Sequence, residues 1–242
     1  MLLLLTAACG GKQGGAVETE SEVISMEQNE PGDSTVYGLA CDGSNDTILV
    51  FLPRTGGDPD TFQILGASRN QQVFGHAMIG DKMAVVASDA DPRVADLVID
   101  MEELKGEWCY LVKPALRARA GLSQAALHQE LKEDTVIQKL MEPREYGFEI
   151  KSDYVARPIG LTRNMTSDEE SPVVFPPLKR YRQWRIFNGQ LILSETSRDT
   201  TGVVSVTNSD TARFVLMRRD TLVLRFADGS EQGYYRKQTV ED

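Results

Sequence analysis

The sequence is poor in the side chains that many hydrolytic and metal-dependent enzymes use. Its only two histidines, His76 and His128, lie far apart in the chain. With three cysteines placed elsewhere, they do not form the closely spaced Cys/His sets that bind structural zinc. A Ser-His-Asp triad is not indicated either, because no Gly-x-Ser-x-Gly turn presents a serine nucleophile. We therefore expect a protein that is not an enzyme and that uses no metal and no cofactor.

Positive charge is also scarce. The chain carries 26 Lys and Arg against 36 Asp and Glu, a formal net charge of −10, and no Lys or Arg lies between Gln13 and Pro53. Proteins that bind nucleic acid without sequence preference rely on Lys and Arg to displace counterions. The run of bases and aromatics from Lys179 to Arg185 would suit a single strand, but in so acidic a chain we expect the arginine stems to cover a buried Trp184. Nucleic acid is not an expected partner.

No apolar run reaches the roughly 18 residues that a membrane-spanning helix needs. A short run does begin the chain, where Leu2–Leu5 and Thr6-Ala7-Ala8 precede Cys9. This order resembles the end of a bacterial lipoprotein signal peptide, in which small residues give the peptidase access and the cysteine takes acyl chains such as palmitate. We therefore expect residues 1–8 to be a signal-peptide remnant and Cys9 to be the lipidation site. Such an anchor implies the bacterial cell envelope, at the outer membrane, on its periplasmic or its surface face.

Residues 9–34 combine low hydrophobicity with acidic charge of one sign. A segment of this kind does not bury enough apolar surface to offset the entropy of ordering. A flexible chain of about 25 residues has an r.m.s. reach of about 28 Å. We expect an acidic tether that holds the folded part clear of the membrane surface.

Short apolar runs separated by turn residues fill residues 35–102. Thr47–Leu52 is a continuous β-branched and aromatic run, and the segment Thr55–Asp60 behind it is rich in Gly, Pro and Asp. Val94–Ile99 is a second run of this kind and follows Asp91-Pro92. About five or six strands in this length are typical of a small closed barrel, with the outline of the oligonucleotide-binding fold. The acidic composition argues against the usual ligand of that fold.

Residues 103–242 predict a second β domain. Ser123–Met141 has apolar residues near helical spacing, with a capping serine at its start and Pro143 behind it, which predicts a helical insertion around 116–142. Further along, Asn188-Gly189 separates two β-rich runs and suits the positive φ angles of a two-residue type I′ turn. The alternating runs that follow indicate an antiparallel up-and-down meander.

Short motifs in this second region occur in an order that resembles the lipocalin-like lipoproteins of Bacteroidetes. Gly106-x-Trp108 is similar to the Gly-x-Trp that opens the first lipocalin strand. The others are Gly147–Ile150, Trp184 with its Asn-Gly hairpin, Asp220–Leu224 and Tyr235-Arg236. The resemblance covers roughly residues 104–238. It implies an eight-stranded cup that can hold an apolar ligand, with Trp108 closing its floor.

The fold class predicted for the whole chain is mainly β. A small N-terminal β-barrel is expected to precede a C-terminal antiparallel lipocalin-like barrel that carries the helical insertion. Large apolar side chains recur at period two along the C-terminal strands. They are the candidate lining of the cup: Trp184, Ile186, Phe214, Leu216, Leu222, Leu224 and Phe226.

Two functions remain open on this basis. If the lining side chains leave a cavity, the protein binds a small apolar molecule in the cup, which is the leading hypothesis. If they fill the barrel, the protein is a protein-interaction or envelope-assembly module.

Two cysteines, Cys41 and Cys109, remain once Cys9 is lipidated. In an oxidising periplasm they could form a disulfide, or they could be two small buried thiols in separate strands. The separation of their Cα atoms decides between these alternatives.

Overall fold

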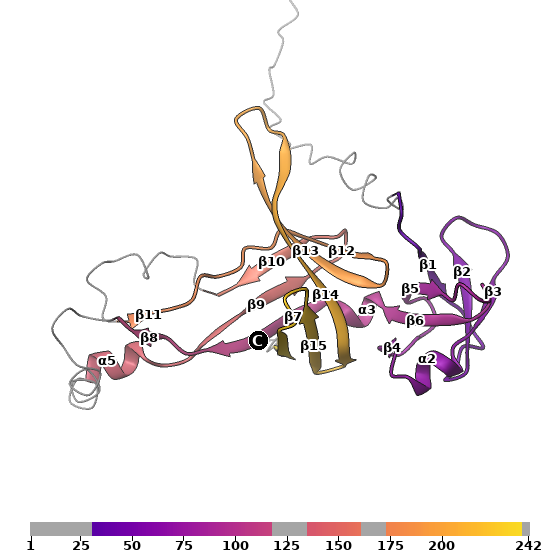
Figure 1. Cartoon of the computed structure of the whole chain (residues 1–242), viewed down its shortest axis with the longest axis horizontal. Helices are drawn as coiled ribbons and strands as arrows, with labels where there is room; N and C mark the ends of the chain where they lie inside the picture. The colour runs from indigo at the N-terminus through magenta and orange to yellow at the C-terminus, as the bar shows by residue number, and fades with distance from the viewer. Residues whose placement is uncertain (1–30, 118–134, 161–172, 239–242) are drawn as a thin grey trace, which may run out of the picture.

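The computed structural model describes residues 31–117, 135–160 and 173–238. The chain is mainly β and forms two β domains that follow one another in sequence (Figure 1). The predicted lipidation site Cys9, residues 9–30 of the predicted tether and residues 118–134 of the predicted helical insertion lie outside the described residues. In the part of the chain that is described, no helix is both long enough and apolar enough to cross a bilayer.

The N-terminal domain is a six-stranded sheet that curls toward a barrel. Its strand order is β3-β2-β1-β5-β6-β4, and the return of the chain to place β5 beside β1 is a Greek-key arrangement. Gln63 at the end of β3 pairs with Val94 just before β6, and its amide donates to the Arg93 carbonyl at 2.7 Å. The end of β3 therefore meets the start of β6 at a single bridge, so this β domain curves toward the small closed barrel predicted from the sequence without a full ladder there. The elements are β1 Thr35–Ala40, β2 Ile48–Pro53, β3 Asp60–Gln63, α2 Leu65–Arg69, β4 Val73–Phe74, β5 Lys82–Ala87 and β6 Ala95–Asp100.

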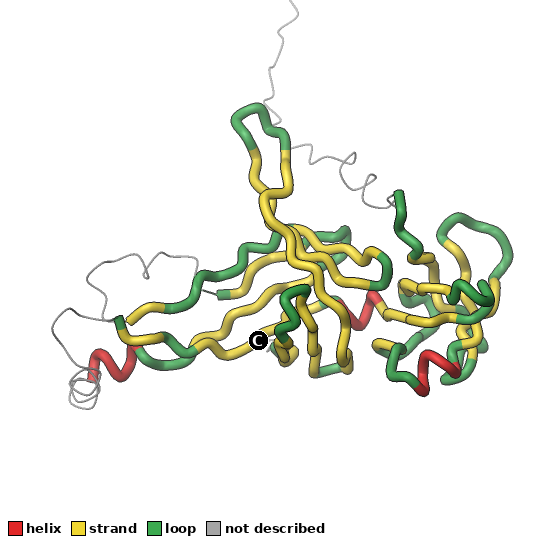
Figure 2. The backbone as a smooth tube through the Cα atoms, in the orientation of Figure 1, coloured by secondary structure: helices red, strands yellow, loops and turns green. Residues whose placement is uncertain are grey.

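The second domain is an eight-stranded antiparallel barrel that is nearly closed. Its order is β10-β9-β7-β16-β15-β14-β13-β12: strands that follow one another along the chain are paired, except β10 and β12, and β16 returns to β7. The remaining gap between β10 and β12 is bridged at one end, where the Trp184 amide donates to the Tyr154 carbonyl at 2.9 Å. This up-and-down order confirms the predicted lipocalin-like barrel (Figure 2). The strands are β7 Gly106–Val112, β9 Arg144–Ile150, β10 Ala156–Ile159, β12 Gln183–Phe187, β13 Gln190–Arg198, β14 Val204–Arg218, β15 Thr221–Phe226 and β16 Glu231–Arg236.

An insertion separates β7 from β9, as the sequence predicts. Its described parts are the short strand β8 Ala115–Leu116 and the helix α5 Thr135–Leu140, which ends before Pro143. Strand β11 Val173–Val174 pairs with β8. A satellite apolar cluster of Val112, Tyr146, Val173 and Phe175 holds the insertion against the barrel.

The N-terminal domain has an apolar core of its own, and a second, larger cluster spans the boundary between the two domains. Helix α3 Met101–Leu104 joins them and is capped by Asp100, whose Oδ1 accepts from the amides of Glu102 at 2.8 Å and Glu103 at 2.9 Å. Met101 and Leu104 of this helix are buried in a cluster that also contains Phe74 and Phe214, one from each domain, with ring centroids 5.3 Å apart. Because the apolar cluster is continuous, we expect the two β domains to unfold together.

The Asn188-Gly189 turn has the predicted geometry. Phe187 pairs with Gln190 across it, and φ is +48° at Asn188 and +69° at Gly189. The tip of this hairpin lies against the N-terminal domain, since a Cβ at Gly189 would come within 2.9 Å of Val86.

Candidate functional site

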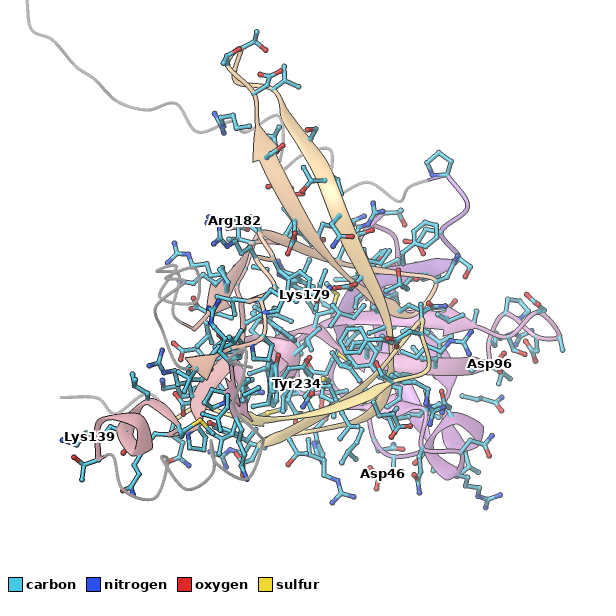
Figure 3. All side chains as sticks on the ribbon, turned by 60° about the vertical axis from the view of Figure 1, so that its left-hand side comes forward. Asp46, Asp96, Lys139, Lys179, Arg182 and Tyr234 are labelled. Atoms are coloured by element: carbon cyan, nitrogen blue, oxygen red, sulfur yellow. The ribbon has the colours of Figure 1, made fainter. Side chains whose placement is uncertain are left out.

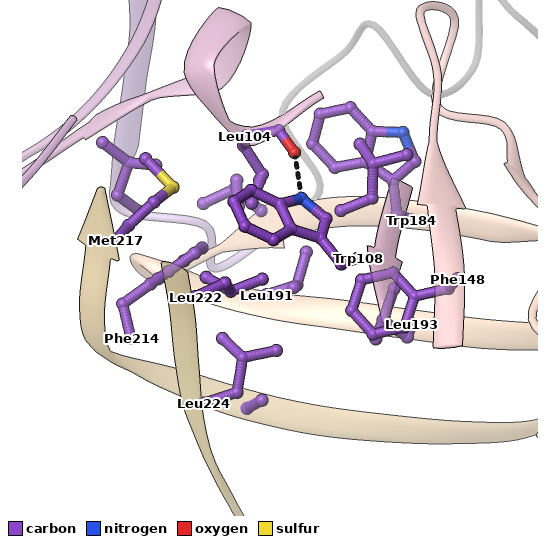
Figure 4. Packing of buried hydrophobic residues seen from close by; sticks show 14 of the residues in the cluster. Leu104, Trp108, Phe148, Trp184, Leu191, Leu193, Phe214, Met217, Leu222 and Leu224 are labelled. Carbon is purple, nitrogen blue, oxygen red and sulfur yellow. Dashed lines mark hydrogen bonds between the residues drawn. The ribbon is translucent and has the colours of Figure 1, made fainter. Parts of the chain in front are cut away.

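Trp108 closes the floor of the C-terminal barrel, where the Gly-x-Trp resemblance places it. The side chain has no exposed surface, and its indole Nε1 donates to the Leu104 carbonyl at 2.8 Å (Figure 4). The guanidinium of Arg236 lies over the indole at 4.1 Å from the ring centroid and donates to the Glu103 carbonyl at 2.5 Å. It also donates to the carbonyls of Lys105 and Arg219. One arginine of β16 therefore links the floor to the α3–β7 connection and to the turn after β14.

The centre of the barrel is filled by side chains rather than open. Leu191, Leu193, Leu222 and Leu224 have no exposed surface, and Phe148 is 1% exposed. They pack around Trp108 in the main apolar cluster (Figure 4). The predicted lining residues Phe214, Leu222 and Leu224 belong to this packed centre. An eight-stranded barrel is narrow enough for side chains to fill it.

Leu216 does not face the barrel interior, and this prediction was wrong. The register between β14 and β15 shifts between Phe214 and Leu216, so that Leu216 pairs with Val223 and Met217 pairs with Leu222. One extra residue at this bulge exchanges the faces of the strand. Met217 therefore takes the inward position and is 4% exposed.

A shallow pocket of about 490 Å³ lies at the opposite end of the barrel from the floor. Tyr110, Tyr234 and Phe226 line it, with Lys179 near its rim; Lys179 and Tyr234 are labelled in Figure 3. The Tyr181 hydroxyl donates to Asp210, and Lys179 Nζ lies 3.0 Å from the same Asp210 oxygen. Burial and this carboxylate raise the pKa of Tyr181, so the phenol stays protonated. Of the predicted lining residues, only Phe226 contacts this pocket.

A larger concave region lies between the two domains and has an apolar half. This half, of about 550 Å³, is lined by Leu39 and Leu52 from β1 and β2 and by Met83 from β5. Met101 of α3 forms part of the wall and is 5% exposed, while Met83 is 1% exposed. Methionine side chains adapt to irregular apolar shapes. The volume and lining are in the range of small-molecule sites.

A polar half of about 500 Å³ adjoins it. Tyr37, Arg54 and Tyr154 line both pockets, so the two adjoin along these side chains, and we call the pair the interdomain cleft. This half adds serine and threonine hydroxyls, Asp33, Gln183 and Arg185, together with the apolar side chains of Phe187, Ile192 and Val206. The predicted cup residues Trp184 and Ile186 also line this half, although each is only 3% exposed.

The walls of the cleft are held together by the segment that precedes β1. Asp33 Oδ1 accepts from the Asn188 amide at 2.9 Å, and the Ser34 amide donates to Asn188 Oδ1 at 2.7 Å. The Tyr37 hydroxyl lies 2.7 Å from the Ile186 carbonyl and 2.9 Å from Asp33 Oδ2. Residues 33–34, predicted as the end of the tether, thus contact the barrel. Burial and the Asp33 charge raise the pKa of Tyr37.

Tyr154, which lines the cleft, has an unusual backbone conformation. Asp153 and Tyr154 have φ values of +60° and +59°, in the turn between β9 and β10. Asp tolerates this region, whereas for a tyrosine it is disfavoured, on the order of 1–2 kcal/mol. The Tyr154 ring lies 5.6 Å from the Trp184 ring, centroid to centroid. Backbone strain of this kind clusters at ligand-binding sites.

Sequence reasoning missed the cleft because its shared wall comes from three distant segments. Tyr37 lies in β1, Arg54 follows β2, and Tyr154 lies between β9 and β10. No spacing in the sequence joins them. Tyr154 directly after Asp153 carries no turn signature, since neither Gly nor Asn is present at the second position.

Cys41 and Cys109 are free thiols, and of the two alternatives the structure rejects the disulfide. Cys41 follows β1 in the N-terminal domain and is partly exposed, whereas Cys109 lies buried in β7 of the second barrel. Burial raises the pKa of the Cys109 thiol to about 11, so that it stays protonated at neutral pH.

His76 packs against an acidic side chain rather than a catalytic group. Its backbone amide donates to Glu103 Oε2 at 2.9 Å, and its ring Nδ1 lies 3.4 Å from the same oxygen. Within residues 31–117, 135–160 and 173–238, no group of three or more His, Cys, Asp or Glu is placed to hold a metal ion. His128 lies outside these ranges.

Comparison with known proteins yields no match: no family model, no curated protein and no solved structure is significantly similar to the chain. The geometry of the two domains is therefore the basis for proposing a function.

Proposed function

We propose that this chain is a non-enzymatic binding protein that takes a small apolar molecule in the interdomain cleft. The observation that carries this proposal is the apolar half of about 550 Å³, whose walls include Leu39, Leu52, Met83 and Met101. The proposed ligand is of the class predicted from the sequence, and the proposed site is the cleft instead of the cup. The barrel interior is occupied by its own side chains and acts as a rigid wall.

The cleft has the features that favour a small-molecule site. It lies between two domains, it combines apolar walls with a few polar groups, and each half falls in the usual volume range of about 300–1,000 Å³. The hydrogen bonds that join Asp33 and Ser34 to Asn188 hold its walls in place before any ligand arrives. Preformed walls lower the ordering entropy that binding must overcome.

The proposal is tested by titrating the neutral dye Nile red into the full chain and its variants. Leu39 is 37% exposed and lines the apolar half, so Leu39→Trp should fill part of the site without crowding the core. Leu111 is 62% exposed on β7 and lines none of the three pockets described above, so Leu111→Trp is the matched control. We expect saturable dye binding that weakens at least tenfold in Leu39→Trp and not in Leu111→Trp.

A third variant separates the cleft from the barrel mouth. Phe226 lines the mouth pocket and not the cleft, so Phe226→Ala should leave dye affinity unchanged. If Phe226→Ala weakens dye binding and Leu39→Trp leaves it unchanged, the ligand binds in the predicted cup and not in the cleft. Absence of saturable dye binding by the wild type would overturn the ligand proposal.

We further propose that a lipid on Cys9 holds the protein at the bacterial outer membrane. The support is the order of small residues before Cys9 and the acidic segment after it. Native mass spectrometry of protein purified from its own envelope would report both the acyl mass and any molecule retained in the cleft.

The filled barrel also favours a second candidate, a protein-interaction module. Strands β13 and β14 extend beyond the barrel as a projecting hairpin (Figure 1). Val203 and Val206 near its tip are 60% and 59% exposed. If this hairpin binds a protein, Val203→Ser should weaken a stoichiometric complex and leave Nile red affinity unchanged, because Val203 lines neither half of the cleft.

A further inference from the structure

The mouth pocket of the C-terminal barrel differs in chemistry from the interdomain cleft. Its aromatic side chains are Tyr110, Tyr181, Phe226 and Tyr234. The other side chains that line it are polar, apart from Ala227. At about 490 Å³, the pocket falls in the size range of small-molecule sites. Rings that lie among hydrogen-bonding groups suit a ligand that has both apolar faces and polar edges.

Tyr234 is held firmly in the wall of this pocket. The side chain is 7% exposed, and its ring packs against Phe148 of the barrel core, with centroids 5.1 Å apart. The Tyr110 ring packs on the same core and stands at 90° to that of Tyr234, with a centroid distance of 5.4 Å. Because the core fixes both rings, they form an aromatic corner before any ligand arrives.

The hydroxyl groups of these two tyrosines are not used by the fold. Among the residues that the structure describes, none makes a hydrogen bond with the hydroxyl of Tyr234 or that of Tyr110. A tyrosine as buried as Tyr234 normally finds a partner for its hydroxyl. Burial and the neighbouring Tyr110 raise the pKa of Tyr234, so its hydroxyl stays protonated and can donate. Both side chains line the pocket, so a molecule inside it meets two donors.

Two acids of the pocket are engaged by the protein but keep acceptor capacity. Tyr181 and Lys179 both contact Oδ2 of Asp210. Asp228 Oδ1 accepts from the amide of Ser230 at 2.9 Å and from its hydroxyl at 2.6 Å. An ionised carboxylate has about four acceptor sites on its two oxygens. Oδ1 of Asp210 and Oδ2 of Asp228 receive no hydrogen bond from the described residues, so each can accept one from a ligand.

The third acid, Glu231, is paired with a base. Arg225 donates to Glu231 Oε1 from Nε at 2.8 Å and also from Nη2. With Lys179 beside Asp210, two of the pocket's three carboxylates thus face a basic side chain, and little net charge remains. An organic cation would compete with these ion pairs, and an anion would approach three carboxylates. A wholly apolar molecule would leave the phenols and carboxylates without partners.

We propose that the mouth pocket binds an uncharged saccharide. Each sugar hydroxyl both donates and accepts, so it matches a site where phenol donors and carboxylate acceptors lie side by side. Tyr110 and Tyr234 donate to oxygens of the sugar, and Asp210 and Asp228 accept from its hydroxyls. Phe226 packs against the apolar C–H face of a sugar ring.

This site is separate from the one proposed for a small apolar molecule. None of the five residues given a role in it lines either half of the interdomain cleft. Ser209 and Thr211 of β14 line both the mouth pocket and the polar half of the cleft, so the two adjoin there. The inference therefore does not rest on the ligand proposed for the cleft.

The test is titration calorimetry of the full chain with four uncharged trisaccharides that differ in linkage and substituents. These are maltotriose, cellotriose, mannotriose and triacetylchitotriose. Trigalacturonate, which is an anion, and tetramethylammonium, which is a cation, are titrated as charged probes. We expect saturable binding of at least one of the four trisaccharides, at least tenfold tighter than that of either charged probe.

Variants that remove a single hydroxyl locate the sugar. Tyr234→Phe and Tyr110→Phe should each weaken binding of the best trisaccharide at least fivefold. Both should leave the melting temperature unchanged, because no described residue makes a hydrogen bond with either hydroxyl. Tyr146→Phe is the matched control and should not affect binding. Tyr146 is 4% exposed in β9, its ring contacts that of Tyr110, and it does not line the pocket.

Two further variants separate this site from the interdomain cleft. Phe226→Ala should weaken trisaccharide binding at least tenfold and leave Nile red affinity unchanged, because Phe226 lines the mouth pocket alone. Leu39→Trp should have the reverse effect, because Leu39 lines only the apolar half of the cleft.

The saccharide site fails if none of the four trisaccharides binds, whatever the result of the Nile red titration of the cleft. A charged probe that binds as tightly as the best trisaccharide would overturn the choice of an uncharged sugar. Unchanged affinity in both Tyr234→Phe and Tyr110→Phe, or an equal loss in Tyr146→Phe, would refute the assignment to the mouth pocket. A loss confined to Leu39→Trp would place the sugar in the cleft instead.

Discussion

Replacing Gly189 with alanine should destabilise the protein through two separate effects. The first is local, because φ at Gly189 is +69°, and an L-residue with a Cβ is strained there by about 1–2 kcal/mol. The second is tertiary, because the new Cβ would lie 2.9 Å from Val86 Cγ2 and 3.1 Å from Leu97 Cδ2 in the N-terminal domain. Overpacking of this kind typically costs about 1–3 kcal/mol. The free energy of unfolding should therefore fall by about 2–5 kcal/mol.

Gly202 is the matched control for the local effect. It lies between β13 and β14 with φ +89°, and a Cβ there would meet no atom within 4 Å. Gly202→Ala should therefore cost only the strain, about 1–2 kcal/mol. Urea denaturation of both variants, analysed by linear extrapolation with a common slope, measures the difference. Equal losses in the two variants would refute the reasoning, because they would show that the Asn188-Gly189 tip does not press on the N-terminal domain.

Three further predictions concern the anchor, the barrel floor and a buried acid. Cys9→Ala should move the protein from the membrane fraction to the soluble fraction or leave it unprocessed, since acyl chains contribute about 0.8 kcal/mol per buried CH₂; unchanged membrane fractionation would contradict the lipid anchor. Arg236→Met should lower the free energy of unfolding by about 2–4 kcal/mol, because the carbonyls of Glu103, Lys105 and Arg219 lose a charged donor, whereas Arg213→Met in the same denaturation assay should change it little. Burial raises the pKa of Asp100 from 3.8 to about 6, so the folded state binds this proton more tightly than the unfolded state, and stability should fall as pH rises from about 4 to about 6. Asp100→Asn should keep the helix cap, flatten that part of the stability–pH profile and stabilise the protein at pH 7 by about 1–3 kcal/mol; a variant that is less stable than the wild type at pH 7 would contradict this account.

Features with a local physical cause were readable from the sequence. Asn188-Gly189 is a turn because these two residues tolerate positive φ, and the two strands beside it follow from that turn. Period-two alternation places Leu222 and Leu224 on the inner face of β15, where both are fully buried. The position of Trp108 at the floor follows the Gly-x-Trp resemblance. In each of these cases a few neighbouring residues carry the whole cause.

The bulge in β14 marks the limit of such reasoning. Period-two alternation from Phe214 predicts that Leu216 faces the barrel interior. No residue type near Leu216 indicates the extra residue of the bulge. The register is decided by the pairing with β15, where Met217 fills the space beside Leu222. Pairing between strands depends on both partners and on the core between them, so one strand's pattern does not determine it.

The interdomain cleft was decided by the tertiary structure alone. Tyr37, Arg54 and Tyr154 come together only because α3 sets the two domains against one another over a shared core. The same holds for Cys41 and Cys109, which the two barrels keep apart as free thiols. The sequence by itself determined that the chain forms β-rich domains and where one of the turns lies, because dihedral preferences and side-chain periodicity act over a few residues. Which distant side chains face one another depends on how the two barrels pack, and only the folded chain specifies that packing.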